Sequence, residues 1–493
     1  MIFNSLEFIA FILVTGLLYF VLPPRRRWVL LLAASYVFYG AWNVKYTALM
    51  AVTTATAWLC GEAVARSGTA RARKGWVAAC LALNLGILAV FKYHAMIASS
   101  VTAVLSSLGS SLAFRPLDVL LPVGISFYTF QALSYVIDVY RDPAQRERHP
   151  GLFALYIAFF PQLVAGPIER AGNILPQLRR TVRFDLDRIG DGLALALWGY
   201  FKKLMIADRL GVFVDQIYAA PGSFSPLQVS LATLFFSFQI YCDFSAYTDI
   251  ARGVAQVFGI DLMENFRTPY FATSIRDFWR RWHISLSTWF RDYMYIPLGG
   301  SRLSPQRTLL NVLVVFAVCG LWHGASWNFV IWGTVHGLML CVLVLWRRAL
   351  PKRAHGPALD AVLDVGRALC LFTAVTLAWV FFRAADLSQA MAVFSKIFHL
   401  VDARLPHTGL GPLQDMKALL LSVPVDGNTH GIILSLVGIA VLLAVDLASR
   451  KNGFLGWYKG LGLVPRWGLC YFLFFATLVF GRLGITKFVY FQF

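Results

Sequence analysis

The stretch LNVLVVFAVCGLWHGASWNFVIWGTVHGLMLCVLVLW, residues 310–346, determines the class of fold. It contains no Asp, Glu, Lys or Arg. A helix of about 20 apolar residues spans the hydrocarbon core of a bilayer, so this stretch is long enough to cross it twice. Two histidines, His323 and His336, nevertheless lie within it. The stretch therefore predicts two successive membrane helices, 308–324 and 326–346, with titratable groups at membrane depth.

The rest of the chain has the same character. Of its 493 residues, 58% are hydrophobic and 14% are charged, and the mean hydropathy is +0.64. Soluble domains are about 45–50% apolar and about 25% charged. The composition therefore excludes a soluble multidomain protein, a disordered chain and a disulfide-rich secreted scaffold. The seven cysteines form no CxxC pair, and we expect no metal site.

Hydropathy predicts an all-α polytopic membrane protein with about 11–13 spans. Two further stretches are predicted as re-entrant or interfacial: 151–167, which is broken by prolines, and 270–298, which carries several charges. The twelve predicted spans are 5–22, 28–44, 46–64, 76–98, 118–140, 190–210, 226–248, 308–324, 326–346, 366–383, 430–449 and 466–485.

The distribution of charge predicts the orientation. The net charge is +19, but the basic residues occur in short runs between apolar stretches, which is typical of cytoplasmic membrane loops and argues against nucleic-acid binding. No basic residue precedes the first span, and Arg25, Arg26 and Arg27 follow it. We therefore expect a multi-pass membrane protein with its N-terminus on the outer side and loop 384–428 on the same side.

The segment RDFWRRWHISLSTWFRDYMYIPLGG, residues 276–300, combines a histidine with arginines and tryptophans. In a continuous helix Arg276, Arg280 and His283 share one face. Guanidinium groups are costly to bury in lipid, so they face water, a partner or an anionic ligand. The alternative is an interfacial amphipathic helix that is held by snorkelling arginines and a tryptophan belt.

The segment CGLWHGASWNFVIWGTVHG, residues 319–337, surrounds His323 with glycine and tryptophan. Burial keeps an imidazole neutral, and a neutral imidazole can act as general base toward a hydroxyl. Gly320 and Gly324 allow a substrate or another backbone to approach closely. For His336 we expect a hydrogen bond to a neighbouring helix rather than a catalytic role.

At these two segments the sequence resembles the membrane-bound O-acyltransferase family. Further segments fit the same family in the same order, and the overall likeness is greatest to its bacterial branch that serves alginate O-acetylation. These segments are LPVGISFYTFQALSYVIDVYR (121–141), FFPQLVAGPIERA (159–171), QIYCDFSAYTDIARG (239–253) and the terminal FVYFQF (488–493).

The resemblance implies a fold and a reaction. The fold is a ring of tilted helices around a central tunnel, formed by a single domain over residues 1–493: less characteristic helices in 1–117, the motif region 118–346, and C-terminal helices in 366–493. The reaction transfers an acyl group from a thioester to a hydroxyl. His323 matches the residue held to be catalytic, and His283 matches a second histidine on the same cavity.

The expected donor is acetyl-CoA, used as a co-substrate and not as a bound cofactor. Planar guanidinium groups suit its phosphates, and tryptophans suit a partly apolar tunnel. Candidate donor- or substrate-binding residues are Arg276, Arg280, Arg281, Arg291, Trp282, Trp322, Trp327 and Asn328, the last as an oxyanion donor.

The acceptor is predicted to be an exopolysaccharide, with alginate favoured, reached directly or through periplasmic partner proteins. The same motifs also fit transferases for cellulose, peptidoglycan or teichoic acid. Two other classes of function are open: a polysaccharide or lipid carrier without chemistry, and a subunit that only scaffolds periplasmic enzymes. The carrier is disfavoured because the chain has no internal repeat, and the scaffold because it gives the intramembrane histidines no purpose.

Overall fold

The computed structural model describes residues 1, 3–349, 356–399, 430–482 and 488. Every regular element in this part of the chain is a helix, which confirms the predicted all-α class. The chain forms two compact units: Met1–Ala196 with Thr248–Glu264, and Leu197–Tyr247 with Asn265–Phe493. Helices α10 (Leu186–Phe201) and α12 (Pro226–Val257) contribute residues to both units.

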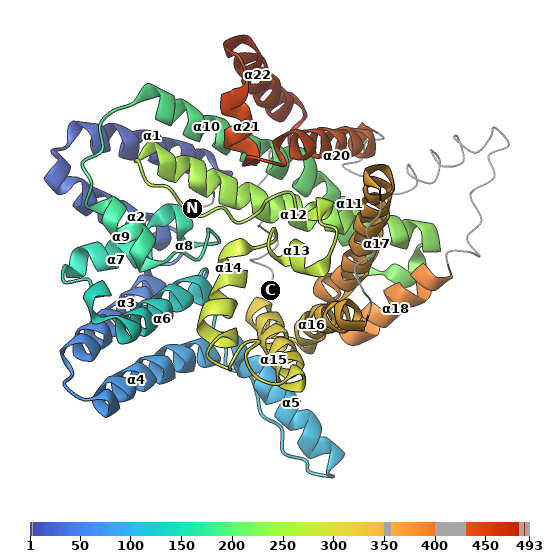
Figure 1. Cartoon of the computed structure of the whole chain (residues 1–493), viewed down its shortest axis with the longest axis horizontal. Coiled ribbons are helices and arrows are strands. Elements are labelled where there is room, and N and C mark those ends of the chain that lie inside the picture. The colour runs from blue at the N-terminus through green and yellow to red at the C-terminus, as the bar shows by residue number, and fades with distance from the viewer. Residues whose placement is uncertain (2, 350–355, 400–429, 483–487, 489–493) are drawn as a thin grey trace. The chain divides into compact units, whose positions relative to one another are not determined.

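The other helices each belong to one unit (Figure 1). The first unit contains α1 (Leu6–Val21), α2 (Arg27–Gly40), α3 (Val44–Arg66), α4 (Ala70–Leu88), α5 (His94–Ser107), α6 (Ile125–Arg141), α7 (Pro150–Ala158), α8 (Phe160–Leu163) and α9 (Ala171–Leu178). The second contains α11 (Asp208–Ala219), α13 (Ile275–Trp279), α14 (Ile284–Phe290), α15 (Pro305–His323), α16 (Trp327–Ala349), α17 (Pro357–Arg383), α18 (Leu387–Phe398), α20 (His430–Ser449), α21 (Gly453–Gly460) and α22 (Leu463–Phe480).

Eight helices within the described residues are long and apolar enough to cross a membrane. This is fewer than the 11–13 predicted, because several apolar stretches form shorter helices: α1 has 16 residues, α2 has 14 and α6 has 17. The eight are Val44–Arg66, Ala70–Ser107, Pro226–Val257, Pro305–His323, Trp327–Trp346, Ala358–Arg383, Gly431–Ser449 and Leu463–Phe480.

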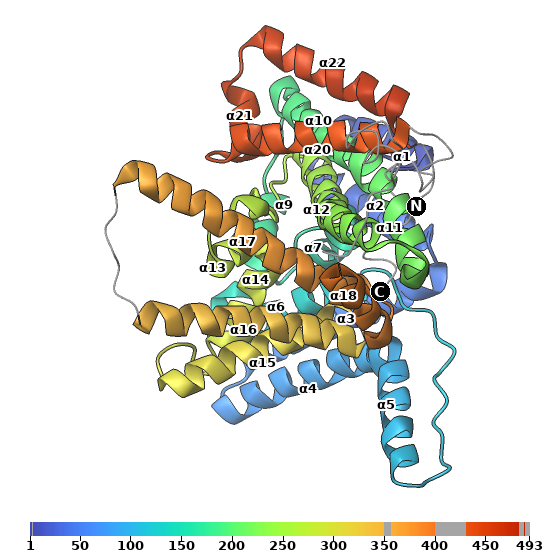
Figure 2. The ribbon, with the colours of Figure 1, turned by 90° about the vertical axis from the view of Figure 1, so that its right-hand side faces the viewer.

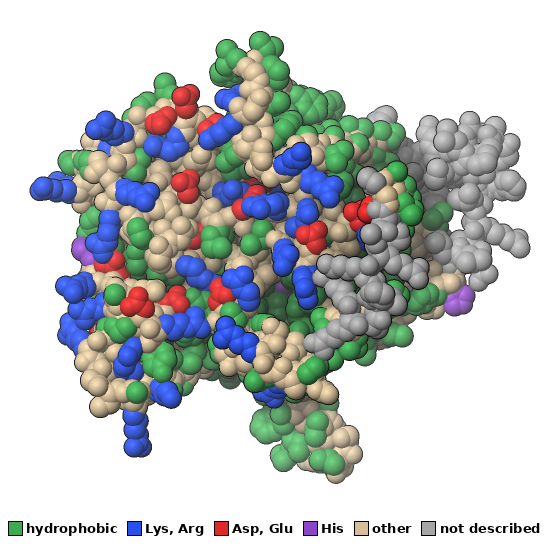
Figure 3. Space-filling model, in the orientation of Figure 1, with side chains coloured by type: hydrophobic (Ala, Val, Ile, Leu, Met, Phe, Trp, Pro, Cys, Tyr) green, Lys and Arg blue, Asp and Glu red, His purple; other side chains and the backbone are tan. Residues whose placement is uncertain are grey.

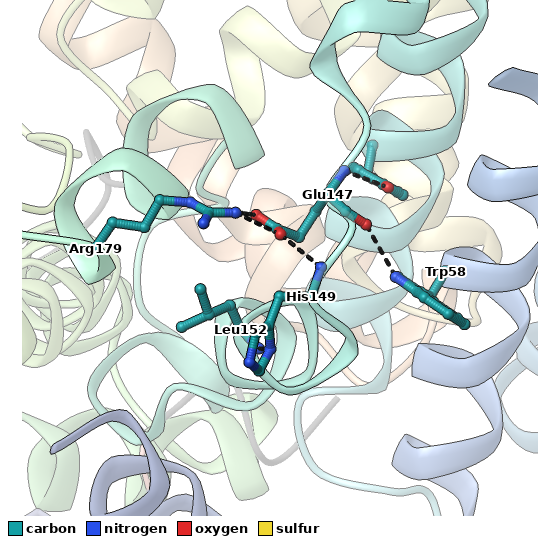
Figure 4. A network of polar contacts seen from close by, with 6 residues as sticks. Trp58, Glu147, His149, Leu152 and Arg179 are labelled. Atoms are coloured by element: carbon teal, nitrogen blue, oxygen red, sulfur yellow. Dashed lines mark hydrogen bonds and ion pairs between the residues drawn. The ribbon is translucent and has the colours of Figure 1, made fainter. Parts of the chain in front are cut away.

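In the first unit, a buried carboxylate fixes the segment between α6 and α7 (Figure 4). Arg179, at the end of α9, donates to both oxygens of Glu147, and the His149 amide donates to one of them at 2.8 Å. The backbone of Glu147 is held as well: its carbonyl accepts from Trp58 Nε1 at 2.9 Å, and its amide donates to the Tyr135 hydroxyl at 3.0 Å. Residues from α3, α6 and α9 therefore hold one loop.

Basic side chains gather on the surface of this unit in the view of Figure 3. They come from helix ends and from connections that the charge pattern predicts to be cytoplasmic. The exposed ones are Arg25, Arg26, Arg66, Arg71, Lys74, Arg141, Arg148, Arg179, Arg180 and Arg183.

The second unit has an aromatic core that includes Trp282, Trp332 and Trp379. A buried lysine lies in the same unit, in the π-helical turn Lys202–Ala207 that joins α10 to α11. The Lys203 ammonium is 2.8 Å from a carboxylate oxygen of Asp208 and 2.6 Å from one of Asp243 in α12. Burial of a charge is tolerated only when it is paired, and here two carboxylates provide the pairing.

Helices α15 and α16 run side by side in both ribbon views (Figures 1 and 2), and glycines make their close contact. A Cβ atom at Gly320 of α15 would overlap the carbonyl oxygen of Phe329 of α16. A Cβ atom at Gly333 of α16 would overlap the carbonyl oxygen of Phe316 of α15. The small residues thus let the two backbones touch, as in tightly packed membrane helices.

The segment 270–298 is not the single helix that the sequence predicts. It consists of α13, α14 and the π-helical turn Arg291–Tyr295, with a break at 280–283. His283 adopts the left-handed conformation (φ 42°), which ends the continuity of the helix. The prediction that His283 shares a helical face with Arg276 and Arg280 is therefore wrong.

The predicted loop 384–428 begins with a helix. Asp386 caps α18 by accepting a hydrogen bond from the Gln389 amide at 2.8 Å. The remainder of this loop from residue 400, and all of the terminal segment FVYFQF except Phe488, lie outside the described residues.

Candidate functional site

His323 is the last residue of α15, and its side chain is 4% exposed. Its ring centroid lies 5.0 Å from those of Trp322 and Trp332 and 5.5 Å from that of Phe382. Gly320, one turn earlier, sets how closely α15 approaches α16 and therefore where His323 lies. The predicted close approach at Gly320 is thus made by another backbone. At Gly324 it is made by the Phe329 ring, which an added Cβ would overlap.

His283 lies beside His323, with 6.1 Å between their ring centroids. The structure therefore brings together the two histidines that the sequence singles out. His283 is 0% exposed and is also in ring contact with Trp322 at 5.8 Å and Phe244 at 4.7 Å. Burial lowers the pKa of His283 to about 3, so its imidazole is neutral at physiological pH.

The tautomer of His283 follows from its capping role. His283 precedes α14, and its Nδ1 accepts a hydrogen bond from the Leu286 amide at 3.4 Å. A neutral imidazole has one donor nitrogen and one acceptor nitrogen. Because Nδ1 is the acceptor, we infer that the proton is on Nε2, which makes Nε2 the donor nitrogen of the ring. The two histidines are thus not equivalent.

The four candidate arginines divide into two pairs. Arg281 is 3.0 Å from Asp277, and Arg291 is 2.7 Å from Asp292, so both guanidinium groups already have a carboxylate partner. Arg276 and Arg280 are exposed, and neither forms a salt bridge with a described residue. They lie four residues apart, on α13 and directly after it.

The tryptophans and Asn328 occupy different surroundings. Trp322 contacts both histidines, whereas Trp282 is buried against Phe278 and Trp379. Trp327 begins α16 and is 60% exposed. The Asn328 side chain is buried, and its Nδ2 donates to the carbonyl of Ala384 at 3.0 Å, which ties α16 to the end of α17.

His336 is completely buried among aromatic rings. Its ring centroid is 4.8 Å from that of Trp332 and 5.2 Å from that of Trp279. Neither of its ring nitrogens has a hydrogen-bond partner in the described part of the chain, so the expected hydrogen bond to a neighbouring helix is not found there. Nor do three His, Cys, Asp or Glu side chains come together as a metal site within the described residues.

Sequence comparison assigns the family. The sequence profile of the membrane-bound O-acyltransferase family matches residues 92–382, which include both histidines. The chain belongs to this family. It is therefore an acyltransferase, and its apolar helices make it a multi-pass membrane protein.

Individual relatives span most of this acyltransferase. It is 36% identical over 423 residues to "Probable alginate O-acetylase AlgI" of Azotobacter vinelandii, which covers 85% of this chain and 83% of that protein. It is 34% identical over 441 residues to "Peptidoglycan O-acetyltransferase" of Helicobacter pylori (83% and 81%). A shorter match, 28% over 240 residues, is to "Teichoic acid D-alanyltransferase" of Streptococcus thermophilus (46% and 57%).

Sequence reasoning missed two buried polar residues of the second unit, one of them beside the site. Asn265, 1% exposed, binds the first residues of α14, as described below. Lys203 forms the buried ion pairs of the second unit, although it lies in a stretch predicted simply as a span. In the sequence, both residues are recognisable only as a charged or amide side chain next to an apolar stretch. Such residues are as common at the ends of helices as in functional sites, so this feature did not single them out.

Proposed function

We propose that this protein is an O-acetyltransferase that takes the acetyl group of a cytoplasmic thioester, acetyl-CoA, for the O-acetylation of an exopolysaccharide. The names of its relatives favour acetyl over other acyl groups and alginate over other polymers. The proposed location is a bacterial inner membrane with the N-terminus in the periplasm. The observation that carries the proposal is the buried pair His283 and His323, with ring centroids 6.1 Å apart.

The two imidazoles have complementary roles in the proposed reaction. His323 takes the proton of the acceptor hydroxyl as its oxygen attacks the acetyl carbon. The Nε2–H of His283 donates a hydrogen bond to the carbonyl oxygen as negative charge develops on it. A C–O bond forms, the C–S bond breaks, and the leaving thiolate takes the proton from His323. Atoms and protons balance in this scheme, and no group changes oxidation state.

The donor is proposed to bind through Arg276 and Arg280. Both are exposed, and their guanidinium groups suit phosphate oxygens. Arg281 and Arg291 lie in the same segment but are paired with Asp277 and Asp292, so they have a structural role as well. The acceptor at the outer side is proposed to be a periplasmic partner protein or the polymer itself.

A second acceptor is favoured by a specific observation. The Helicobacter pylori relative named for peptidoglycan matches nearly the same share of the chain as the relatives named for alginate. The same chemistry on peptidoglycan is therefore the alternative. The proposed chemistry uses the same two histidines for either acceptor. The acceptor is therefore identified as the polymer that loses its acetyl esters when these histidines are substituted.

The first experiment compares cells that carry wild type, His323→Ala or His336→Phe. Secreted polymer, peptidoglycan and the ester-linked acetyl groups of each are quantified, together with the amount of protein in the membrane. We expect His323→Ala to abolish acetylation of one polymer while the polymer itself is still made. His336→Phe is the matched control: it replaces a buried histidine that already lies among aromatic rings, and we expect normal acetylation. Normal acetylation by His323→Ala contradicts the role as base, and loss of the polymer itself favours a carrier.

A further inference from the structure

One buried residue, Asn265, holds the start of α14. Its side-chain Oδ1 accepts hydrogen bonds from the amide and the hydroxyl of Ser285, at 3.1 and 2.9 Å. Its backbone carbonyl accepts from the Ile284 amide at 2.9 Å. The next amide, that of Leu286, is bound by His283 Nδ1. Asn265 and His283 together therefore satisfy the first amides of the helix, which have no partner within it.

The same segment also binds the residues before His283. The Arg267 amide donates to the carbonyl of Arg281 at 2.9 Å, and Arg281 Nη1 donates to the Thr268 hydroxyl at 3.3 Å. Residues 265–268 thus run alongside residues 281–285, and hydrogen bonds flank His283 on both sides. These hydrogen bonds restrict the backbone conformation of His283.

The backbone itself is strained at this place. Among the described residues, the non-glycine positions with positive φ are Thr268 at 44° and His283 at 42°. Left-handed conformations are unfavourable for non-glycine residues and persist only where neighbours enforce them. Both strained residues belong to the pairing that Asn265 begins. The pairing therefore enforces a conformation that the sequence alone disfavours.

The bond that sets the tautomer of His283 is weak by itself. At 3.4 Å, the Leu286 amide lies at the long end of hydrogen-bond distances to Nδ1. Small movements of the first turn of α14 would break it, and the imidazole would then be free to turn or to shift its proton. Two shorter hydrogen bonds, which the adjacent Ser285 donates to Asn265 Oδ1, limit this movement.

We propose that Asn265 is a positioning residue that acts through His283. By fixing the first turn of α14, it keeps Nδ1 as the acceptor and Nε2 as the nitrogen that donates to the reacting carbonyl. This inference rests on the proposed function, because it assumes that His283 assists the acyl transfer. In this scheme Asn265 touches no substrate; its hydrogen bonds within the described residues are those from residues 284 and 285.

The test is a double-mutant cycle. Membranes from cells with the complete acetylation system carry wild type, Asn265→Ala, His283→Ala or both changes, and release of thiol from acetyl-CoA is measured against donor concentration. We expect Asn265→Ala to lower kcat by about 10- to 100-fold, because small misplacements of a catalytic group cost this much, with the donor KM unchanged. The double variant should be no slower than His283→Ala, since Asn265 then has nothing to position.

The control is Asn43→Ala, which removes an asparagine that caps α3 by accepting from the Lys45 amide at 3.0 Å. It makes the same chemical change at a helix cap in the first unit, and we expect kcat to stay within about twofold of wild type. If Asn265→Ala fails to accumulate, Ser285→Ala removes one of the two bonds to Oδ1 and leaves Asn265 in place. A smaller loss of kcat is expected, again absent in the His283→Ala background.

Three results overturn the inference: an unchanged kcat in Asn265→Ala, independent losses that multiply in the double variant, and a normal kcat in His283→Ala. The last also removes His283 from the proposed mechanism but leaves the acyltransferase proposal standing, since that depends on His323→Ala. Loss of activity in His323→Ala with multiplicative losses at residues 265 and 283 refutes only the positioning role.

Discussion

Two residues of the same type have different chemistry here because of what surrounds them. His283 has its Nδ1 committed to the Leu286 amide, so its remaining nitrogen carries the proton. His323 ends a membrane helix among aromatic rings. The proposed site thus places a hydrogen-bond donor, His283, beside a proton acceptor, His323, with both imidazoles neutral before the reaction.

The exposed arginines allow a test of where the donor binds. We expect Arg280→Ala to raise the KM for acetyl-CoA roughly tenfold, because a charge-assisted hydrogen bond to phosphate is lost, while kcat stays the same. Initial rates against donor concentration measure this. Arg302→Ala removes another exposed arginine of the same unit and serves as the control. An unchanged KM in Arg280→Ala contradicts a phosphate contact.

The buried carboxyl group of Glu169 should make the folding stability of the protein depend on pH. It is 0% exposed and accepts hydrogen bonds from Asn173 and the Met263 amide, and burial raises its pKa to about 7 from 4.5. The native state therefore keeps a proton that the unfolded state has lost. The stabilising contribution is full below about pH 4.5 and is lost as the pH rises through about 7.

We therefore expect the thermal midpoint of the wild-type protein in detergent to fall across this pH range, and Glu169→Gln to flatten the curve. The exposed Asp187→Asn is the control and should leave the slope in place. If the thermal midpoint of Glu169→Gln still falls with rising pH, other titrating groups cause the pH dependence.

At the residue scale, the sequence identifies the two candidate catalytic histidines but not the residues that hold them in place. His283 and His323 stand out because histidine is costly in apolar sequence. Asn265 does not stand out, because its importance comes from hydrogen bonds to residues 20 positions away, which no local pattern encodes. The pairing of Arg281 with Asp277, by contrast, has the i, i+4 spacing of a helix and could be predicted from the sequence.

At the scale of elements, the contact of α15 with α16 controls the place of His323. Gly320→Ala puts a methyl group into the carbonyl oxygen of Phe329, so the helices must separate. We expect a loss of roughly 1–3 kcal/mol of stability and of most acetyl transfer. Thermal unfolding and ester content measure the two effects.

The matched control is Gly86→Ala in α4, where nothing lies within 4 Å of an added Cβ. Alanine favours helix over glycine by about 1 kcal/mol, so this variant should be as stable as wild type or more so. Equal behaviour of the two variants would show that the backbone contact at Gly320 is not required.

Apolar runs predict where helices lie but not where they end. The predicted span 118–140 begins only at Ile125, because Pro122 lacks an amide hydrogen and Gly124 adopts a left-handed conformation (φ 76°). The single predicted helix over 270–298 breaks at His283, whose φ of 42° is enforced by residues 265–268. In the first place residues of the segment itself delay the start of the helix, and in the second place contacts distant in sequence override the local pattern.

At the scale of the whole molecule, the charge distribution predicts orientation. In a cysteine-free background, we expect Ser111→Cys to react with a membrane-impermeant maleimide in intact spheroplasts, and Gly68→Cys to react only after permeabilisation. Both positions are exposed and belong to the first unit. Basic connections remain on the cytoplasmic side, and residue 68 lies in one of them. The opposite labelling pattern would invert the proposed topology.

The ion pairs of Lys203 have a consequence for how the chain is made. Asp243 lies in α12, a helix long and apolar enough to cross the bilayer, and an aspartate at the centre of such a helix costs about 2.5–3.5 kcal/mol at insertion. Lys203 is synthesised 40 residues earlier. We expect the ribosome-bound chain to keep the Lys202–Ala207 turn beside the translocon until α12 emerges, so that both charges enter lipid together. A Lys203→Met chain should then stall at the insertion of α12 and be degraded early, before any question of catalysis arises.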